Sequence, residues 1–263
     1  APIAGSGRNM QRDDWYTSTR SAEQLADPEA VGRYAAQRAL ARIGARGLDT
    51  RKVPVLFEAP LAAGLLGAFV QATSGGALYR KTTFLVDSLG KPVFAPHVQI
   101  VEDPHVPRAM GSAPFDEEGV RTRQRSVVKD GVVEGYFLST YSARKLGMQT
   151  TGNAGGSHNL SLQSSSTRPE DDFEQMLRKL GTGLLLTELM GQGVNYVTGD
   201  YSRGASGFWV ENGKIQYPVE EITVASTLQE MFRHIVAIGA DTITRGTKQT
   251  GSVLIERMTI AGQ

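Results

Sequence analysis

The chain has 263 residues, 40% of them hydrophobic and 21% charged, and its 28 basic and 27 acidic side chains leave a net charge of +1. This balance excludes an extended field of one sign that would draw the chain onto nucleic acid or an anionic membrane, and no run of about eighteen apolar residues is present to span a bilayer. The absence of cysteine excludes disulfides, thiolate metal sites and a cysteine nucleophile, and it is in keeping with a reducing, cytoplasmic location.

The amino-terminal residues 1–50 are predicted to form a helical lead-in. Their helix begins where Asp27 can act as N-cap and Pro28 can occupy the first helical position, and it ends near Gly44. The chain starts at Ala1 without a methionine or a signal peptide. We therefore expect the natural protein to extend further toward its amino terminus.

A sheet-rich core is predicted over residues 51–263. The apolar run at 53–57 predicts a strand, and Pro54 favours a position at a sheet edge. A helix rich in Ala, Leu and Gly is predicted to follow at 60–72. Its Gly64 and Gly67 are expected to allow close packing against another element.

After residue 78 the pattern changes to short strand-like runs separated by Gly, Pro and Asp. These runs cover residues 83–86, 93–94, 98–101, 121–128 and 132–138. Lys129-Asp130-Gly131 predicts a hairpin turn between the last two. Arg121, Arg123 and Arg125 alternate along one predicted strand, which favours a solvated strand face over a phosphate-binding patch.

The second half of the chain repeats this mixture of helices and strands. Helices are predicted at 139–146, 171–179 and 226–238, strands at 194–198, 207–211, 214–217 and 253–260, and a long irregular loop, typical of function, at 148–168. Because strands cluster rather than alternate with helices, the sequence predicts an α+β fold. Its sheet should be mainly antiparallel and curled (barrel-like or sandwich-like), with several flanking helices.

Catalytic motifs readable from spacing alone are missing. The four histidines, His97, His105, His158 and His234, form no HExxH-type pair, so a scattered metal site is the less favoured interpretation. Neither a GxSxG elbow nor a phosphate-binding glycine loop occurs. His158 lies in the Gly-rich loop and is the most interesting histidine, as a ligand or substrate contact; a structural role in the loop is the favoured alternative.

Several segments, taken together and in order, resemble one known family. They are YRK (79–81) with DSLG (87–90), FDEEGVRT (115–122), YSARKLG (141–147), TGNAGG (151–156), ELMGQG (188–193), GDYSRG (199–204) and GFWVENG (207–213). The set resembles the TldE (PmbA) type of the TldD/PmbA family, once called modulators of DNA gyrase, over essentially the whole chain. The resemblance is to the C-terminal portion of such proteins, so the family's N-terminal domain is expected to lie outside this sequence.

The resemblance carries an implication about metal. In this family the TldD-type subunit has an HExxxH helix with two zinc-ligand histidines and a general-base glutamate, and a cysteine near its C-terminus completes the site. Here Glu58 stands at the first histidine position, Ala59 at the glutamate and Ala63 at the second histidine. Without those groups nothing would hold zinc or deprotonate a water. The resemblance thus implies no catalytic or metal-binding residue in this subunit, with zinc in the TldD-type partner.

The resemblance also implies a role and partners. A heterodimeric TldD/TldE metallopeptidase would process small or unfolded peptides, including peptide-antibiotic precursors and antitoxins, with no membrane partner and no direct contact with nucleic acid. An extended peptide could enter by pairing with a sheet edge. A homodimer of the chain in isolation is a further expectation.

Site residues beyond the degenerate motif are less sharply indicated. Candidate peptide or interface contacts are Gly155, Gly156, His158, Asp200 and Arg203, for which loop geometry is an equally good explanation. Two alternatives stay open. One is a regulatory binding module, such as a gyrase modulator, that acts without proteolysis; the other is an autonomous hydrolase that uses His97, His105 or His158 with a nearby carboxylate.

Overall fold

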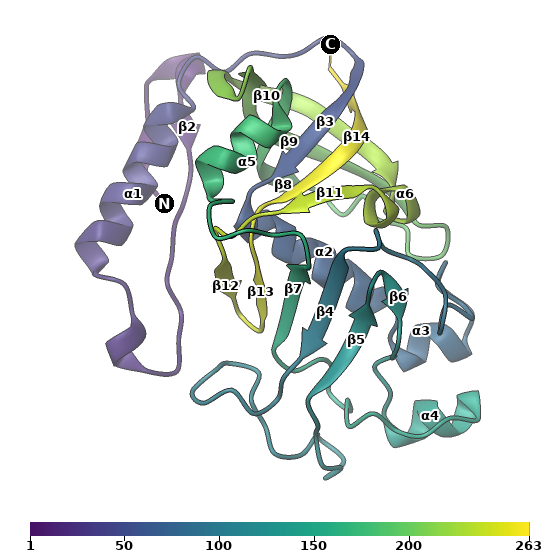
Figure 1. Cartoon of the computed structure of the whole chain (residues 1–263). Coiled ribbons are helices and arrows are strands. Elements are labelled where there is room, and N and C mark those ends of the chain that lie inside the picture. Colours follow the sequence, from purple (N-terminus) through teal and green to yellow (C-terminus); the bar gives the residue numbers. More distant parts are fainter. Residues whose placement is uncertain (263) are drawn as a thin grey trace.

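Five strands close on themselves into a barrel in the computed structural model, which describes residues 1–262 (Figure 1). They are β3 (Arg51–Phe57), β8 (Gly183–Met190), β9 (Asp200–Glu211), β10 (Lys214–Thr227) and β14 (Val253–Ala261). They pair in the order β10-β9-β8-β3-β14, and β14 pairs back to β10. Strands β3 and β8 run parallel and the other barrel pairs are antiparallel. The predicted α+β fold with a mainly antiparallel, barrel-like sheet is confirmed.

The hairpin of β9 and β10 supplies the curvature that closes the barrel. Its turn is at Asn212 and Gly213, whose φ angles of 51° and 73° suit the tight turn predicted by the Asn-Gly pair. Register shifts between Val219 and Ile222 mark an irregularity in β10, and such bulges bend a strand and increase its twist. The long, bent β10 can therefore pair with β9 along its length and still reach β14.

A second sheet lies below the barrel in Figure 1. Its order is β12 (Ile243–Arg245), β13 (Lys248–Thr250), β7 (Leu160–Ser164), β4 (Val98–Glu102), β5 (Arg125–Lys129) and β6 (Val132–Val133). The predicted hairpin between β5 and β6 is confirmed, with positive φ at Asp130 and Gly131.

Helix α2 (Ala59–Ala72) joins the two sheets, since it contacts β8 of the barrel and β12 and β13 of the second sheet. Apolar side chains around most of its circumference are buried, as expected for a helix with core on several sides. Phe69 is completely buried and meets the rings of Phe94, Phe137 and Phe232 edge to face at 5.1–6.5 Å between centroids. This aromatic cluster is the centre of the main core.

The remaining helices cover the two sheets. Helix α5 (Phe173–Leu180) packs Met176 and Leu177 on the outer face of the barrel, against Leu56 and Leu185. Helices α3 (Gly75–Tyr79) and α4 (Thr140–Leu146) lie against each other beside the second sheet, and α6 (Leu228–Arg233) leads into β11 (Ile235–Ile238), which adds to β14. Every helix within residues 1–262 is too short or too polar to span a bilayer.

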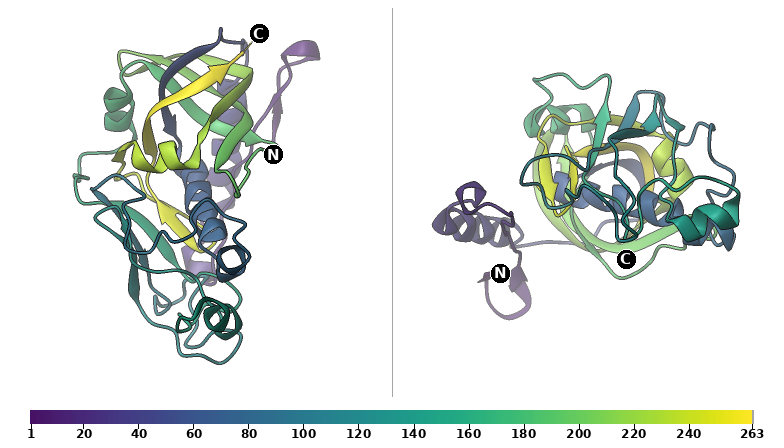
Figure 2. Two further views of the ribbon diagram at one scale, coloured as in Figure 1. Left: turned by 90° about the vertical axis from the view of Figure 1, so that its right-hand side faces the viewer. Right: turned by 90° about the horizontal axis from the view of Figure 1, so that it is seen from below.

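Residues 1–50, here called the arm, lie on one side of the barrel, at the left in Figure 1 and in the right-hand view of Figure 2. The arm holds β1 (Ile3–Ala4), β2 (Gln11–Arg12), the short 3-10 turns η1 (Gly7–Asn9) and η2 (Ala22–Gln24), and helix α1 (Pro28–Ala41). As predicted, Pro28 opens this helix, and Asp27 caps it by accepting the N–H of Ala30 at 2.8 Å.

Three predicted strands are wrong. Residues 83–86, 93–94 and 194–198 form turns or irregular chain. In the first case Lys81 and Asp87 have φ angles of 56° and 55°, which break an extended backbone on both sides. The apolar pattern there reflects burial of Leu85 in the core and not pairing in a sheet.

Other predictions need correction in their extent, and the strand predicted at 132–138, for example, is a strand only at Val132–Val133. The helix predicted at 226–238 is capped by Thr227 rather than Ser226 and ends at Arg233, because the residues from Ile235 onward pair with β14. Strand β5 begins only at Arg125, so the alternating arginines before it do not lie on a strand.

The close packing predicted at Gly64 of α2 is wrong. Gly64 is exposed, and a Cβ atom added there would have open space around it.

A cavity at the amino end of helix α2

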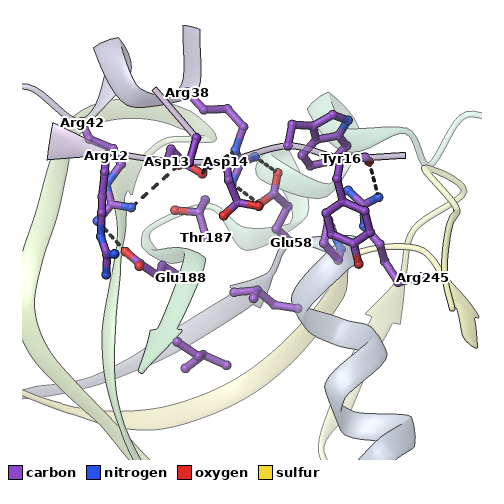
Figure 3. Close-up of a pocket in the computed structure, with 15 residues that line it drawn as sticks. Arg12, Asp13, Asp14, Tyr16, Arg38, Arg42, Glu58, Thr187, Glu188 and Arg245 are labelled. Atoms are coloured by element: carbon purple, nitrogen blue, oxygen red, sulfur yellow. Dashed lines mark hydrogen bonds and ion pairs between the residues drawn. The ribbon is translucent and has the colours of Figure 1, made fainter. Parts of the chain in front are cut away.

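A cavity of about 440 Å³ opens at the amino end of α2, between the arm and the barrel (Figure 3). The polar side chains that line it are Arg12, Asp13, Asp14, Tyr16, Arg38, Arg42, Glu58, Thr187, Glu188 and Arg245. They come from the arm, from the start of α2, from β8 and from β12. The cavity includes Glu58, which the sequence resemblance places at the first position of a zinc motif, and this makes it the candidate functional site.

Glu58 occupies that first position and is bound by an arginine. It is the N-cap residue of α2 but makes no capping hydrogen bond with its side chain. Instead Oε1 accepts Arg38 Nη1 at 2.6 Å and Oε2 accepts Arg38 Nη2 at 3.1 Å. Such a two-pronged pair is the strongest geometry available to these two groups. Each carboxylate oxygen thereby accepts a hydrogen bond from the guanidinium of Arg38.

Further ion pairs extend from Arg38 across the cavity. Asp13 Oδ1 accepts Arg38 Nε at 3.0 Å, and Oδ2 lies 3.8 Å from Arg42 Nη1. Arg42 Nη2 in turn lies 2.6 Å from Glu188 Oε2 on β8. These five side chains, here called the ion-pair chain, run from α2 through the arm to the barrel as Glu58–Arg38–Asp13–Arg42–Glu188 (Figure 3). The arm is therefore tied to the barrel by charges.

Burial acts in opposite directions on the pKa values of Glu58 and Arg38, the first two members of the ion-pair chain. Desolvation raises the pKa of Glu58, and the hydrogen bonds from Arg38 act against that rise. For Arg38, desolvation alone lowers the pKa, but the hydrogen bonds and charges of Glu58 and Asp13 raise it overall. Arg38 consequently stays charged at all physiological pH values, and each carboxylate depends on it for compensation.

The other two motif positions offer no donor atom. Ala59 and Ala63 are 4% and 7% exposed and present only methyl groups. A catalytic zinc takes about three protein ligands drawn from His, Cys, Asp and Glu. Within residues 1–262 no three His, Asp or Glu side chains gather as a metal site would need. The donor set at the amino end of α2 therefore does not fit zinc.

The edge of the cavity is closed by aromatic side chains of the arm. The Arg245 guanidinium lies 4.3 Å from the ring centre of Trp15 and 4.2 Å from that of Tyr16, and Nη1 donates to the Tyr16 carbonyl at 2.8 Å. Cation–π contacts of this kind hold an extended segment in place. Thr187 Oγ1, by contrast, is buried at the cavity without a hydrogen-bond partner among the described residues.

None of the five candidate contact residues lines this cavity. Gly155 and Gly156 have φ angles of 93° and 118° in the loop before β7, as a glycine-rich loop requires. His158 in the same loop is 9% exposed, and its ring nitrogens bond the carbonyls of Gly111 and Gly152 at 3.3 and 2.9 Å. These contacts hold the loop together, so a role for the three residues in binding stays a prediction.

The other two candidates lie on β9 of the barrel. Asp200 is exposed and accepts the Thr198 hydroxyl at 2.6 Å. Arg203 has a buried Nε with no hydrogen-bond acceptor within residues 1–262. Its neighbour Tyr201 is buried, which raises the pKa of the phenol to about 12, against the charge of Arg203. Their proposed contacts also stay predictions.

The histidines of the autonomous-hydrolase alternative each have their own local partners. His97 bonds Ser164 Oγ and the Ile235 carbonyl, both at 2.8 Å. His105 Nε2 lies 3.2 Å from the Thr122 hydroxyl. Neither residue, nor His158, contributes to the cavity at α2. The structure therefore offers no constellation in which one of them is placed beside a carboxylate in that cavity.

Sequence reasoning missed most of the ion-pair chain. Asp13, Arg38 and Arg42 are polar residues of a surface helix and its preceding segment, and their type alone indicates solvation. Asp241 was missed as well: it is a half-buried carboxylate near Glu58 whose pKa burial raises, despite two hydrogen bonds from Ser252. The one usable signal was Glu58 itself, as an acid directly before an otherwise apolar helix.

Comparison with known proteins supports the reading of the sequence. Residues 50–262 match the family described as PmbA/TldA metallopeptidase C-terminal domain. The chain is 52% identical to "Metalloprotease PmbA" of Escherichia coli O157:H7 and 47% identical to "Metalloprotease PmbA homolog" of Haemophilus influenzae, over 99% of its length in both cases. It spans only 57% of the length of each of these relatives.

Solved structures with the same fold support this family membership. A protein of Thermotoga maritima described as a proposed modulator of DNA gyrase has a TM-score of 0.90 at 33% identity, over 98% of this chain and 60% of its own. One of Bacteroides thetaiotaomicron with the same description has a TM-score of 0.91 at 28% identity, over 99% and 58%. TldE of Thermococcus kodakarensis, at 21% identity and a TM-score of 0.81 over 99% and 61%, shares the fold.

Proposed function

Because the chain belongs to the PmbA/TldD metallopeptidase family, we propose that it acts as the non-catalytic, TldE-type subunit of a two-subunit zinc peptidase. A TldD-type partner holds the zinc and cleaves peptides, and this chain supports the partner's fold and helps to enclose the space where peptides are cut. The resemblance read from the sequence motifs is thus confirmed at the level of the family, and the role is the proposal.

The observation that carries the proposal is the pair of Arg38 and Glu58. At the position where a TldD-type subunit has its first zinc-ligand histidine, this chain has a carboxylate whose two oxygens accept two hydrogen bonds from a guanidinium. A metal ion would have to displace Arg38 and would leave a buried cation without its partner, which is unfavourable. With methyl groups at Ala59 and Ala63, the chain offers neither further ligands nor a general base.

In this proposal the residues of this chain have a structural role. The ion-pair chain fixes the arm against the barrel, and α2 keeps the helix position that a catalytic subunit uses for its motif. Peptide substrates, including peptide-antibiotic precursors and antitoxins, belong to the assembled enzyme in this proposal, and so does a cytoplasmic location. A homodimer in isolation would use the surface that otherwise meets the partner.

The test compares this chain alone, a TldD-type partner alone and an equimolar mixture, each with a quenched fluorescent peptide that has no stable fold. We expect cleavage only when the partner is present and the highest rate in the mixture. Zinc content by mass spectrometry, after mild dialysis, should be below about 0.1 equivalent in this chain alone.

A partner whose first motif histidine is replaced by alanine is the matched control and should abolish cleavage in the mixture. Cleavage by this chain alone with close to one equivalent of zinc would overturn the proposal. So would a mixture that elutes as two separate proteins in size-exclusion chromatography with no change in rate.

A further inference from the structure

Four arginine side chains line one hollow of about 560 Å³ beside α4. Arg121 and Arg123 come from the segment before β5, Arg125 is the first residue of β5, and Arg144 comes from the last turn of α4. The hollow shares no lining residue with the cavity at α2. In a chain with a net charge of only +1, four cations around one hollow are a local concentration of positive charge.

The four arginines differ in whether they form an ion pair with a carboxylate. Arg125 is anchored, because its Nε donates at 2.7 Å to Oε2 of Glu102, a carboxylate that is 1% exposed. For Arg121, Arg123 and Arg144, no carboxylate within residues 1–262 lies within the 4.0 Å of an ion pair. All three are exposed. The hollow therefore has one fixed cation in its wall and three cations whose charges are unpaired.

Nearby acids are held elsewhere. The carboxylate of Glu118 lies next to the rim, but its Oε2 accepts the N–H and the hydroxyl of Thr140 at 2.7 and 2.6 Å, at the start of α4. It forms no ion pair with the arginines of the hollow in the described chain. The charges of Arg121, Arg123 and Arg144 are thus left for a ligand from outside.

Main-chain groups at the same place are also free. Neither Arg123 nor Gln124 makes a main-chain hydrogen bond to another residue in the part of the chain that the structure describes. Both residues are exposed and lie just before β5, where the sheet pairing begins. An extended peptide can use such groups as a short sheet edge, and its side chains then lie within reach of the flanking arginines.

From these observations we infer that the hollow binds an acidic segment of polypeptide, through Asp or Glu side chains or a C-terminal carboxylate. Guanidinium groups match carboxylates with two parallel hydrogen bonds, and the free main-chain groups suit a peptide backbone. Nucleic acid is the less suitable ligand, because it is bound by long basic tracks or by stacking on aromatic rings, and the lining of this hollow contains no aromatic residue.

The inference extends the proposed function by giving this subunit a preference for acidic peptides, but it is tested without the partner. The probe is a fluorescein-labelled peptide of alternating Glu and Gly, measured by anisotropy at low and moderate salt with the chain alone. Arg123→Gln with Arg144→Gln should weaken binding at least about tenfold. The matched pair Arg33→Gln with Arg178→Gln removes the same charge from exposed sites elsewhere and should change affinity less than twofold.

Each other outcome decides against the inference. If a peptide of alternating Gln and Gly binds as tightly as the peptide of alternating Glu and Gly, the hollow does not recognise carboxylates. Equal loss in the two double variants would reduce the effect to net charge, and a single-stranded oligonucleotide that displaces the peptide at lower concentration than the unlabelled peptide itself would assign the hollow to nucleic acid. Absence of peptide binding by the unsubstituted chain overturns the inference, whereas the cleavage assay with the partner is unaffected by it.

Discussion

Arg38 on α1 and Glu58 at the start of α2 form a two-pronged pair, with nitrogen–oxygen distances of 2.6 and 3.1 Å, that joins the arm to the barrel. The two side chains are each only 12% exposed. Both oxygens of Glu58 are thus engaged in an internal contact, and the amino end of α2 is an attachment point for the arm.

Removal of Arg38 from its pair with Glu58 should destabilise the fold. Arg38→Ala leaves Glu58 and Asp13 without their shared cation, and we expect it to lower the free energy of unfolding by about 3 kcal/mol. Urea denaturation followed by circular dichroism measures this. Arg38→Met combined with Glu58→Gln removes both charges and should recover at least half of the loss. A single variant within about 0.5 kcal/mol of the unsubstituted chain would show that the pair does not attach the arm.

Substitution in the aromatic centre of the core should be equally severe. Phe69→Ala removes a ring that contacts three others and is completely buried, so unfolding should become easier by about 4 kcal/mol. Phe115 is 60% exposed and serves as the control, since Phe115→Ala should cost less than about 1 kcal/mol. Similar losses for the two variants in thermal or urea denaturation would contradict the assigned core.

Two glycines should respond to alanine in opposite directions. Gly64 lies in helix α2 with open space around it, so Gly64→Ala should stabilise the protein by about 0.5–1 kcal/mol through helix propensity. At Gly207 a Cβ would stand 1.9 Å from the Leu185 carbonyl oxygen, so Gly207→Ala must push β9 and β8 apart. Melting temperatures should rise for the first and fall for the second; a fall for both would mean that α2 is packed at Gly64 after all.

Acid should weaken the fold partly through Asp171. Its Oδ1 lies 2.7 Å from Lys179 Nζ, and this hydrogen bond, together with the N–H of Arg168, lowers the pKa of the carboxyl below its ordinary 3.8. The charged form is favoured by folding, so this contribution is complete above pH 3.8 and is lost as pH falls through the lowered value.

Asp171→Asn should therefore reduce stability at neutral pH and flatten its decline below about pH 4. Urea denaturation at pH 3, 4 and 7 makes the comparison, with the exposed Glu170→Gln as control. An unchanged pH dependence in Asp171→Asn would remove this carboxyl from the account of acid sensitivity.

The sequence predicts most of the elements, because local rules apply to them. The cap at Asp27, the hairpin turns at Asp130 and Asn212 and the helix of residues 60–72 follow from residue type and spacing. The turn around Leu85 was mistaken for a strand, since a buried apolar run has the same composition in either state. The closure of the barrel is harder to predict from the sequence, because a bulge in β10 depends on how the strands pair and not on amino-acid composition.

The candidate site was predictable only in part. Glu58, Ala59 and Ala63 could be read as a degenerate motif because a known motif exists to compare them with. The ion-pair chain could not, since Asp13, Arg38 and Glu188 are far apart in sequence and only the fold brings them together. Likewise the alternation of Arg121 and Arg123 was interpreted as a strand face, whereas Arg144 from a separate helix completes the hollow.

Closure of the barrel by β14 has a consequence for synthesis of the protein. This last strand pairs with β3, about 200 residues earlier in the chain, and with β10 and β11. Until residues 253–261 have left the ribosome, β3 and β10 present unpaired edges and the main core lacks the buried side chains of β14. The nascent chain therefore stays dependent on protection from aggregation until β14 emerges, and a truncation within β14 should yield insoluble protein rather than a smaller folded one.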